Sequence, residues 1–172
     1  MRGNLGTVAG VASAWGLKGR LRGAAGIGGA FRGCLECTVE ITRRAKIQAG
    51  AAYTKERRIV LNAQLLLLGR EADRDATFLH ECAHVIADLR YGRNCRHDWR
   101  WQRVMALLGE PPEISHKLEY LSRETHAVVT WICTGCGEEY HYVRAPRRRI
   151  WECYCSMCGP EGGRLRAAEG FP

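Results

Sequence analysis

Two histidines and a glutamate stand close together in the middle of the chain, at His80, Glu81 and His84. On a helix, residues four apart project from one face, so both imidazoles can share one tetrahedral metal ion. Glu81 is then placed to take a proton from a metal-bound water rather than to bind the metal, as in the H-E-x-x-H pattern of zinc hydrolases. These residues form a candidate catalytic zinc site.

Apolar residues around this pattern recur at helical spacing and predict a mostly buried helix that covers residues 77–91 and that Asp73 or Asp75 can start. Gly92 is the residue expected just past a helix end. The alternative is a surface helix with two solvated histidines, which the apolar flanks disfavour. The apolar positions are Phe78, Leu79, Cys82, Val85, Ile86 and Leu89.

A third ligand is expected in the segment after this helix. His97 precedes a second helical pattern at 102–109 and would leave the fourth coordination position to water. Cys95 is the rival, but three imidazoles keep the ion a stronger Lewis acid. Trp101, one turn after His97, is expected to pack the second helix on the metal helix and hold the ligand in place.

Residues before the candidate site predict a small antiparallel sheet. Apolar and polar residues alternate over 35–42, and the segments 45–53 and 57–61 predict two more strands joined by a polar turn. We expect this hairpin to lie against the metal helix. Cys34 and Cys37 have C-x-x-C spacing, but their strand periodicity favours structural cysteines over metal ligands.

Four cysteines near the end of the chain have the spacing of a zinc ribbon, with two C-x-x-C pairs around an intervening segment. Four thiolates would close the ion off from water, so this second site is expected to be structural. Cys153 is an alternative to Cys155, although only Cys155 keeps the tight spacing to the last cysteine. The expected ligands are Cys133, Cys136, Cys155 and Cys158.

The segment between the cysteine pairs predicts a hairpin, 139–144 with 147–151, that has a basic tip. Arginines can pair with phosphates, and exposed aromatic rings can stack on bases. The alternative is a solvated turn whose aromatic residues, including Tyr140 and Tyr142, only cover the ribbon core. The candidate nucleic-acid contacts are Arg144, Arg147, Arg148, Arg149 and Trp151.

Composition and charge limit the kinds of partner and compartment that the chain can have. The net charge of +8 makes nucleic acid or another polyanion a reasonable partner. The nine cysteines cluster in pairs, which favours metal binding in a reducing compartment over a secreted disulfide framework. No apolar run is long enough for a membrane span and no clean secretory signal is present, so we expect an intracellular protein. Residues 1–33, basic and rich in Gly and Ala, are expected to form a flexible arm.

These motifs together resemble the SprT-like, or Spartan-type, zinc metalloprotease family. The segment 58–66 fits the family's I-x-L-N-x-x-L-L run, and the candidate site matches its H-E-x-x-H helix. His97 opens a stretch similar to the family's H-G-x-x-[F/W], with Trp101 in place but Asp98 where glycine is usual. Ser115 and His116 resemble a Thr/Ser-His element that precedes the ribbon in bacterial members. The resemblance covers roughly residues 38–166.

The resemblance implies a zincin-like α+β metalloprotease domain at 34–122, followed by a zinc ribbon at 123–172. It implies two zinc ions, one catalytic and one structural, and an endopeptidase whose substrates are DNA-bound or DNA-crosslinked proteins, with single-stranded or junction-like DNA as partner. One alternative is a non-catalytic DNA-binding zinc adaptor; another is a zinc peptidase whose ribbon docks a protein. Tyr91 and His116 are candidates for a second oxyanion donor.

Overall fold

The computed structural model describes residues 2–114 and 117–168 of the chain. Contacts among residues divide the chain into two compact units, the first ending at Lys117 and the second beginning at Leu118. The chain combines helices with small sheets, so the α+β class predicted from the sequence is confirmed. Ser115 and His116 lie outside the described residues.

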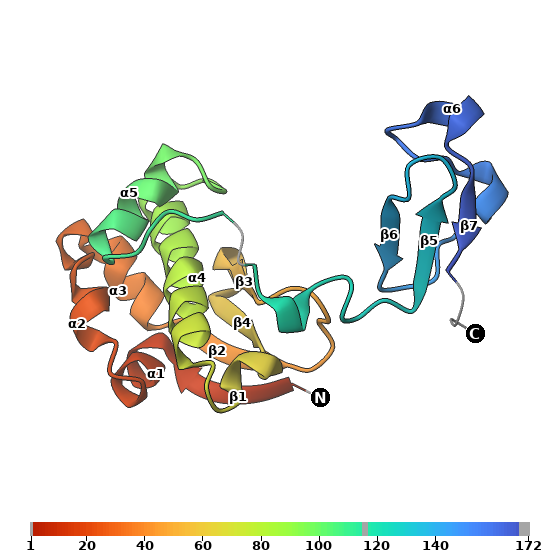
Figure 1. Ribbon diagram of the computed structural model, residues 1–172. Helices are drawn as coiled ribbons and strands as arrows, with labels where there is room; N and C mark the ends of the chain where they lie inside the picture. The colour runs from red at the N-terminus through yellow and green to blue at the C-terminus, as the bar shows by residue number, and fades with distance from the viewer. Residues whose placement is uncertain (1, 115–116, 169–172) are drawn as a thin grey trace. The chain divides into compact units, whose positions relative to one another are not determined.

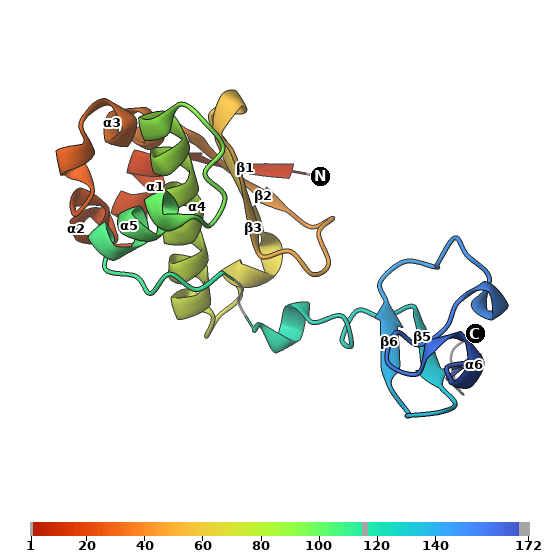
Figure 2. The same cartoon turned by 90° about the horizontal axis from the view of Figure 1, so that it is seen from above.

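Helix α4 (Glu71–Tyr91) lies at the centre of the first unit, against the sheet (Figures 1 and 2). It packs on the sheet on one side and on α3 (Gly29–Leu35) and α5 (Trp99–Leu107) on the other. Acidic residues in its first turn suit the helix dipole, and Gly92, with φ 65°, ends it. The predicted buried helix is confirmed, with an earlier start.

The first sheet has four strands in the order β1-β2-β4-β3. They are β1 (Arg2–Thr7), β2 (Thr38–Thr42), β3 (Gly50–Tyr53) and β4 (Arg58–Asn62). β3 and β4 form the predicted hairpin, but β4 rather than β3 lies beside β2, and that pair is parallel. The expectation of an antiparallel sheet is therefore wrong: the sheet is mixed. The first predicted strand also begins later, because α3 extends to Leu35.

Asn62 fixes the end of the central strand β4. Its side-chain amide donates to the carbonyl oxygens of Ala45 (2.8 Å) and Gln48 (3.0 Å), and its side-chain oxygen accepts from the Gln64 amide. The residue is buried, with 2% of its surface exposed. The Asn62 side chain thus holds the loop before β3 and caps the short 3-10 helix η3 (Ala63–Leu66). These hydrogen bonds explain why the I-x-L-N motif has asparagine at this position.

The flexible arm expected for residues 1–33 is not what the structure contains. Residues 2–35 form β1, α1 (Val8–Ala14), α2 (Lys18–Arg22), the 3-10 turn η1 (Ala25–Ile27) and α3. β1 pairs with the open edge of β2, and the buried residues Val8, Val11 and Leu21 join the core. A Cβ at Gly23 would clash with the Leu107 carbonyl oxygen, so this glycine serves close packing on α5 rather than flexibility.

The second unit is built on a three-stranded antiparallel sheet in the order β6-β5-β7. The strands are β5 (Val129–Cys133), β6 (Glu139–Tyr142) and β7 (Leu165–Ala167). The short helical elements are η4 (Glu119–Leu121), η5 (Ile150–Glu152) and α6 (Gly159–Gly162).

The predicted hairpin between 139–144 and 147–151 is wrong. β6 pairs with β5 instead, and residues 150–152 form the 3-10 turn η5. Pro146 lies between the two segments and has no amide hydrogen to donate to a strand ladder, which disfavours continued pairing there.

Within the described residues, no helix combines the length and the apolar character that crossing a membrane requires.

Candidate metal centres

Three imidazoles converge beside α4, at the candidate zinc site that the sequence predicts. His80 and His84 come from α4 and His97 from the loop before α5, and each pair of Nε2 atoms is 3.2 Å apart. Nitrogens bound tetrahedrally to one zinc ion at 2.0–2.1 Å would be separated by about 3.3 Å. The three side chains therefore fit a single ion. Cys95, the rival ligand, is not in this group; its thiol contacts the Arg93 carbonyl oxygen at 3.5 Å.

Burial prepares these imidazoles to bind metal. It lowers the pKa of His84 to about 4, with the neighbouring His97 as the second cause, and it lowers the pKa of His97 as well. Both rings are then neutral at pH 7, which is the form that coordinates a metal ion.

Asp88 positions the loop that carries His97, and sequence reasoning missed it. One carboxylate oxygen accepts from the Cys95 amide at 2.8 Å, and the other accepts from the Thr54 hydroxyl at 3.0 Å. Asp88 lies one turn beyond His84 on α4, so the helix that supplies two ligands also anchors the segment that supplies the third. An acidic residue one turn after the second histidine was the available signal.

Trp101 packs against all three histidines, as predicted. Its buried ring lies 4.8 Å from the His80 ring, 5.4 Å from that of His84 and 4.7 Å from that of His97, between centroids. Asp98 directly precedes α5, which carries Trp101, and its side chain accepts from the Arg100 amide at 2.9 Å. Aspartate in place of the glycine usual in similar sequences therefore acts as a helix N-cap.

Glu81 is buried between α4 and the edge strand β3, with 6% of its surface exposed. Burial raises the pKa of Glu81 to about 8, and a hydrogen bond from the backbone amide of Ala52 opposes this shift. A Cβ on Gly50 would lie 2.9 Å from both Cγ and Oε1 of Glu81, so the strand leaves no space beside the carboxylate. The edge strand thus fixes the position of Glu81, which is outside the group of three histidines.

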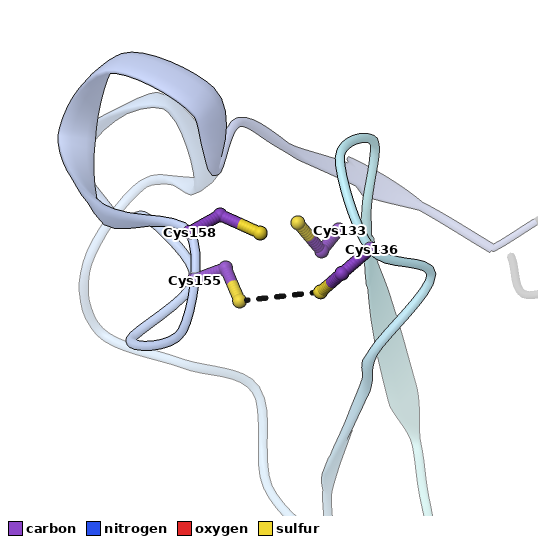
Figure 3. Close-up of side chains that lie close together, drawn as sticks. All are labelled: Cys133, Cys136, Cys155 and Cys158. Carbon is purple, nitrogen blue, oxygen red and sulfur yellow. Dashed lines mark hydrogen bonds between the residues drawn. The ribbon is translucent and has the colours of Figure 1, made fainter.

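Four cysteine thiols converge in the second unit (Figure 3). Cys136 and Cys155 Sγ atoms are 3.7 Å apart, against about 3.8 Å for two sulfurs on a tetrahedral zinc ion at about 2.3 Å. Cys153 is left outside this group. The four thiols that the structure brings together are Cys133, Cys136, Cys155 and Cys158, and their arrangement is consistent with zinc.

Tyr140 supports one of these sulfurs. Its hydroxyl donates to Cys155 Sγ at 3.1 Å and accepts from the Ser156 amide at 3.3 Å. This hydrogen bond is the main cause that lowers the pKa of Cys155 and favours the thiolate, which is the form that binds metal. Tyr142 packs on Trp131, with ring centroids 4.7 Å apart. Both tyrosines therefore belong to the ribbon core.

The expected nucleic-acid contacts of the second unit lie on its surface. Trp151 is 73% exposed, and the Arg149 guanidinium lies 5.3 Å from the centroid of its ring. Arg144, Arg147, Arg148 and Arg149 are all exposed. The structure thus leaves these side chains available to a partner on a loop rather than at a hairpin tip.

Comparison with known proteins gives a family match that lies mostly within the first unit. The SprT-like family model matches residues 29–121. Protein SprT of Pseudomonas aeruginosa is 30% identical over 118 residues, covering 64% of this chain and 70% of that protein. Protein SprT of Erwinia tasmaniensis is 30% identical over 122 residues, covering 68% and 70%, and that of Pseudomonas paraeruginosa is 37% identical over 121 residues, covering 64% and 70%. No solved structure matches the chain significantly.

An α+β unit with three converging imidazoles, and a second unit with four converging thiols, define a candidate metalloprotein. The chain belongs to the SprT-like family. The family match starts within α3 and ends before β5, so it includes part of the segment expected to be an unmatched arm and does not include the ribbon sheet.

The choice between Cys153 and Cys155 gives a direct prediction for the second centre. Cys155→Ser should reduce the zinc content by one ion per chain and make the segment after Leu118 sensitive to protease, because a structural zinc site contributes folding energy. Cys153→Ser should keep the zinc and the resistance. Elemental analysis with limited proteolysis measures both; loss of zinc in Cys153→Ser alone would contradict the assignment.

Proposed function

We propose that this chain is a zinc-dependent endopeptidase that cleaves proteins bound or crosslinked to DNA. The observation that carries the proposal is the convergence of His80, His84 and His97 at 3.2 Å spacing beside the buried carboxylate of Glu81. Membership of the SprT-like family supports the same chemistry.

The three histidines would hold the catalytic ion. Zinc bound there would polarise the scissile carbonyl and lower the pKa of a water molecule toward neutrality. Burial alone would keep Glu81 protonated at pH 7, but the positive charge of a zinc ion bound by the three histidines would lower its pKa. The carboxylate would then accept a proton from the attacking water and pass it to the amine nitrogen as the peptide C–N bond breaks. Asp88 and Trp101 keep the third imidazole in place through the loop and through ring packing.

The edge strand supports binding of an extended peptide. β3 ends the sheet order β1-β2-β4-β3, and its residues Gly50 and Ala52 lie against Glu81. An extended segment can add to such an edge through main-chain hydrogen bonds, which gives little side-chain specificity. Selectivity would then come from recruitment by DNA.

The exposed arginines and Trp151 of the second unit support DNA as the recruiting partner. The four thiols would hold a structural zinc ion that fixes this unit. DNA binding and the intracellular location stay predictions. Tyr91 stays a candidate oxyanion donor; its ring contacts Trp99, with centroids 5.9 Å apart.

Glu81→Gln tests the proposed chemistry. The zinc-loaded variant should lose about 10²–10⁴-fold in cleavage rate, because the amide cannot accept the proton, while its zinc content stays unchanged. The substrate is one protein supplied free and as a covalent conjugate with a single-stranded oligonucleotide, and cleavage is followed by electrophoresis.

Glu113→Gln, on an exposed residue of the same unit, is the matched control and should cleave like the wild type. Equal cleavage by Glu81→Gln and wild type would refute the assigned role. Absence of cleavage by the zinc-loaded wild type on both substrates would favour the non-catalytic DNA adaptor.

Gly50→Ala tests the link between the edge strand and Glu81. The added methyl group would meet Cγ and Oε1 of Glu81 and Cγ2 of Thr77, all at 2.9 Å, so the carboxylate must shift. A displacement of this kind should slow cleavage by about 10²-fold without loss of zinc. Gly19→Ala, where a Cβ has no neighbour within 4 Å, should leave the rate unchanged. A wild-type rate in Gly50→Ala would show that Glu81 is not held by this strand.

A further inference from the structure

A second concentration of positive charge lies within the sequence of the first unit. Residues 90–103 join the last turn of α4 to the first turns of α5 and carry five arginines and one acidic residue. The arginines are Arg90, Arg93, Arg96, Arg100 and Arg103. His97, a proposed metal ligand, lies inside this segment.

The acidic residues nearby are already engaged within the fold. Asp98 caps α5 and pairs with Arg100 at 2.8 Å. Asp88 accepts from the Cys95 amide and the Thr54 hydroxyl. Across the described ranges 2–114 and 117–168, the other four arginines of the segment form no ion pair, and all four are exposed. Their charge is therefore uncompensated.

Two aromatic rings are exposed in the same place. Trp99 is 56% exposed and Tyr91 37% exposed, and their centroids are 5.9 Å apart. The Arg100 guanidinium lies 4.6 Å from the Trp99 centroid and 5.3 Å from that of Tyr91. This cation lies over both rings, while more than half of the surface of Trp99 stays open to a partner.

We propose that an arginine–aromatic surface, made by Arg90, Tyr91, Arg93, Arg96, Trp99 and Arg103, binds single-stranded nucleic acid. Exposed guanidinium groups pair with phosphates, and an exposed indole ring stacks on an unpaired base. A peptide of aspartate and glutamate would satisfy the arginines but has no aromatic ring to stack on Trp99. A duplex keeps its bases stacked inside and would not reach the ring.

The arginine–aromatic surface lies beside the metal centre of the proposed peptidase. Arg96 and Asp98 flank His97 on one loop, so a bound strand would lie at the rim of the metal centre. A protein attached to that strand would then be delivered to the site. This consequence depends on the proposed function, whereas the binding itself does not.

The test uses the full chain with Glu81→Gln, which blocks hydrolysis, and a fluorescein-labelled oligothymidylate followed by anisotropy at several salt concentrations. Arg93→Gln with Arg96→Gln should weaken binding about tenfold and reduce the slope of log affinity against log salt by about 1.4, from about 0.7 per phosphate contact. Trp99→Ala should weaken binding about tenfold, and Trp99→Phe should restore most of it.

The matched control is Arg43→Gln with Arg44→Gln, which removes two exposed arginines from another loop of the same unit. Its affinity and salt slope should equal those of the parent protein. Zinc content and melting temperature are measured for every variant, so that a damaged metal centre is recognised.

Two results would overturn the proposal. One is that the Arg93/Arg96 and Trp99 variants bind like the Arg43/Arg44 control, which would leave the ribbon as the nucleic-acid contact. The other is that polyglutamate of equal charge competes as well as the oligonucleotide, which would make this an acidic-peptide surface. Failure of the peptidase proposal is read separately, from cleavage by wild type against Glu81→Gln.

Discussion

The structure of the first unit depends on one constraint, which is that an imidazole from a loop must meet two imidazoles fixed on a helix. A helix places His80 and His84 together automatically, since residues four apart lie on one face. The loop residue His97 has no such guarantee. Its place is set by Asp88, which fixes the loop backbone, and by Trp101, whose ring contacts all three histidines.

The same helix organises the surrounding elements. Its buried face packs on β3 and β4, which brings the edge strand to Glu81, and its other sides pack on α3 and α5. Asp88 also accepts a hydrogen bond from the hydroxyl of Thr54, which lies in the turn between β3 and β4. The hairpin and the loop that carries His97 are therefore bound to the same carboxylate. The proposed base and the third ligand are therefore positioned through a common set of contacts. The packing around Glu81 is close, since a Cβ on Gly50 would lie 2.9 Å from its side chain.

Local features of the fold could be predicted from the sequence, and non-local pairing could not. The helix of α4 and the strands around Val39 and Val60 follow from side-chain periodicity, and the His and Cys groups follow from ligand spacing. The N-terminal segment was misjudged because its glycines suggest flexibility, whereas β1 is stabilised by an edge of β2 more than thirty residues away and Gly23 by contact with Leu107. The partner of β6 was missed for the same reason.

The roles of individual side chains could likewise be predicted from the sequence only in part. Spacing identified the residues that would touch the metal, and Trp101 beside them. It did not identify Asp88 and Tyr140, which support ligands, or Gly50, which lies against Glu81, because their importance appears only when distant segments meet. Asn62 was noted as part of a motif, yet its function in tying down the loop before β3 required the structure.

The measurement that tests the central claim most directly is the zinc content of the intact protein beside that of His97→Ala. The two convergent groups predict two zinc ions per chain in the wild type and one in the variant, with the remaining ion held by the four cysteines. Two ions in His97→Ala would contradict the account, because the loop imidazole would then not be needed to hold the metal.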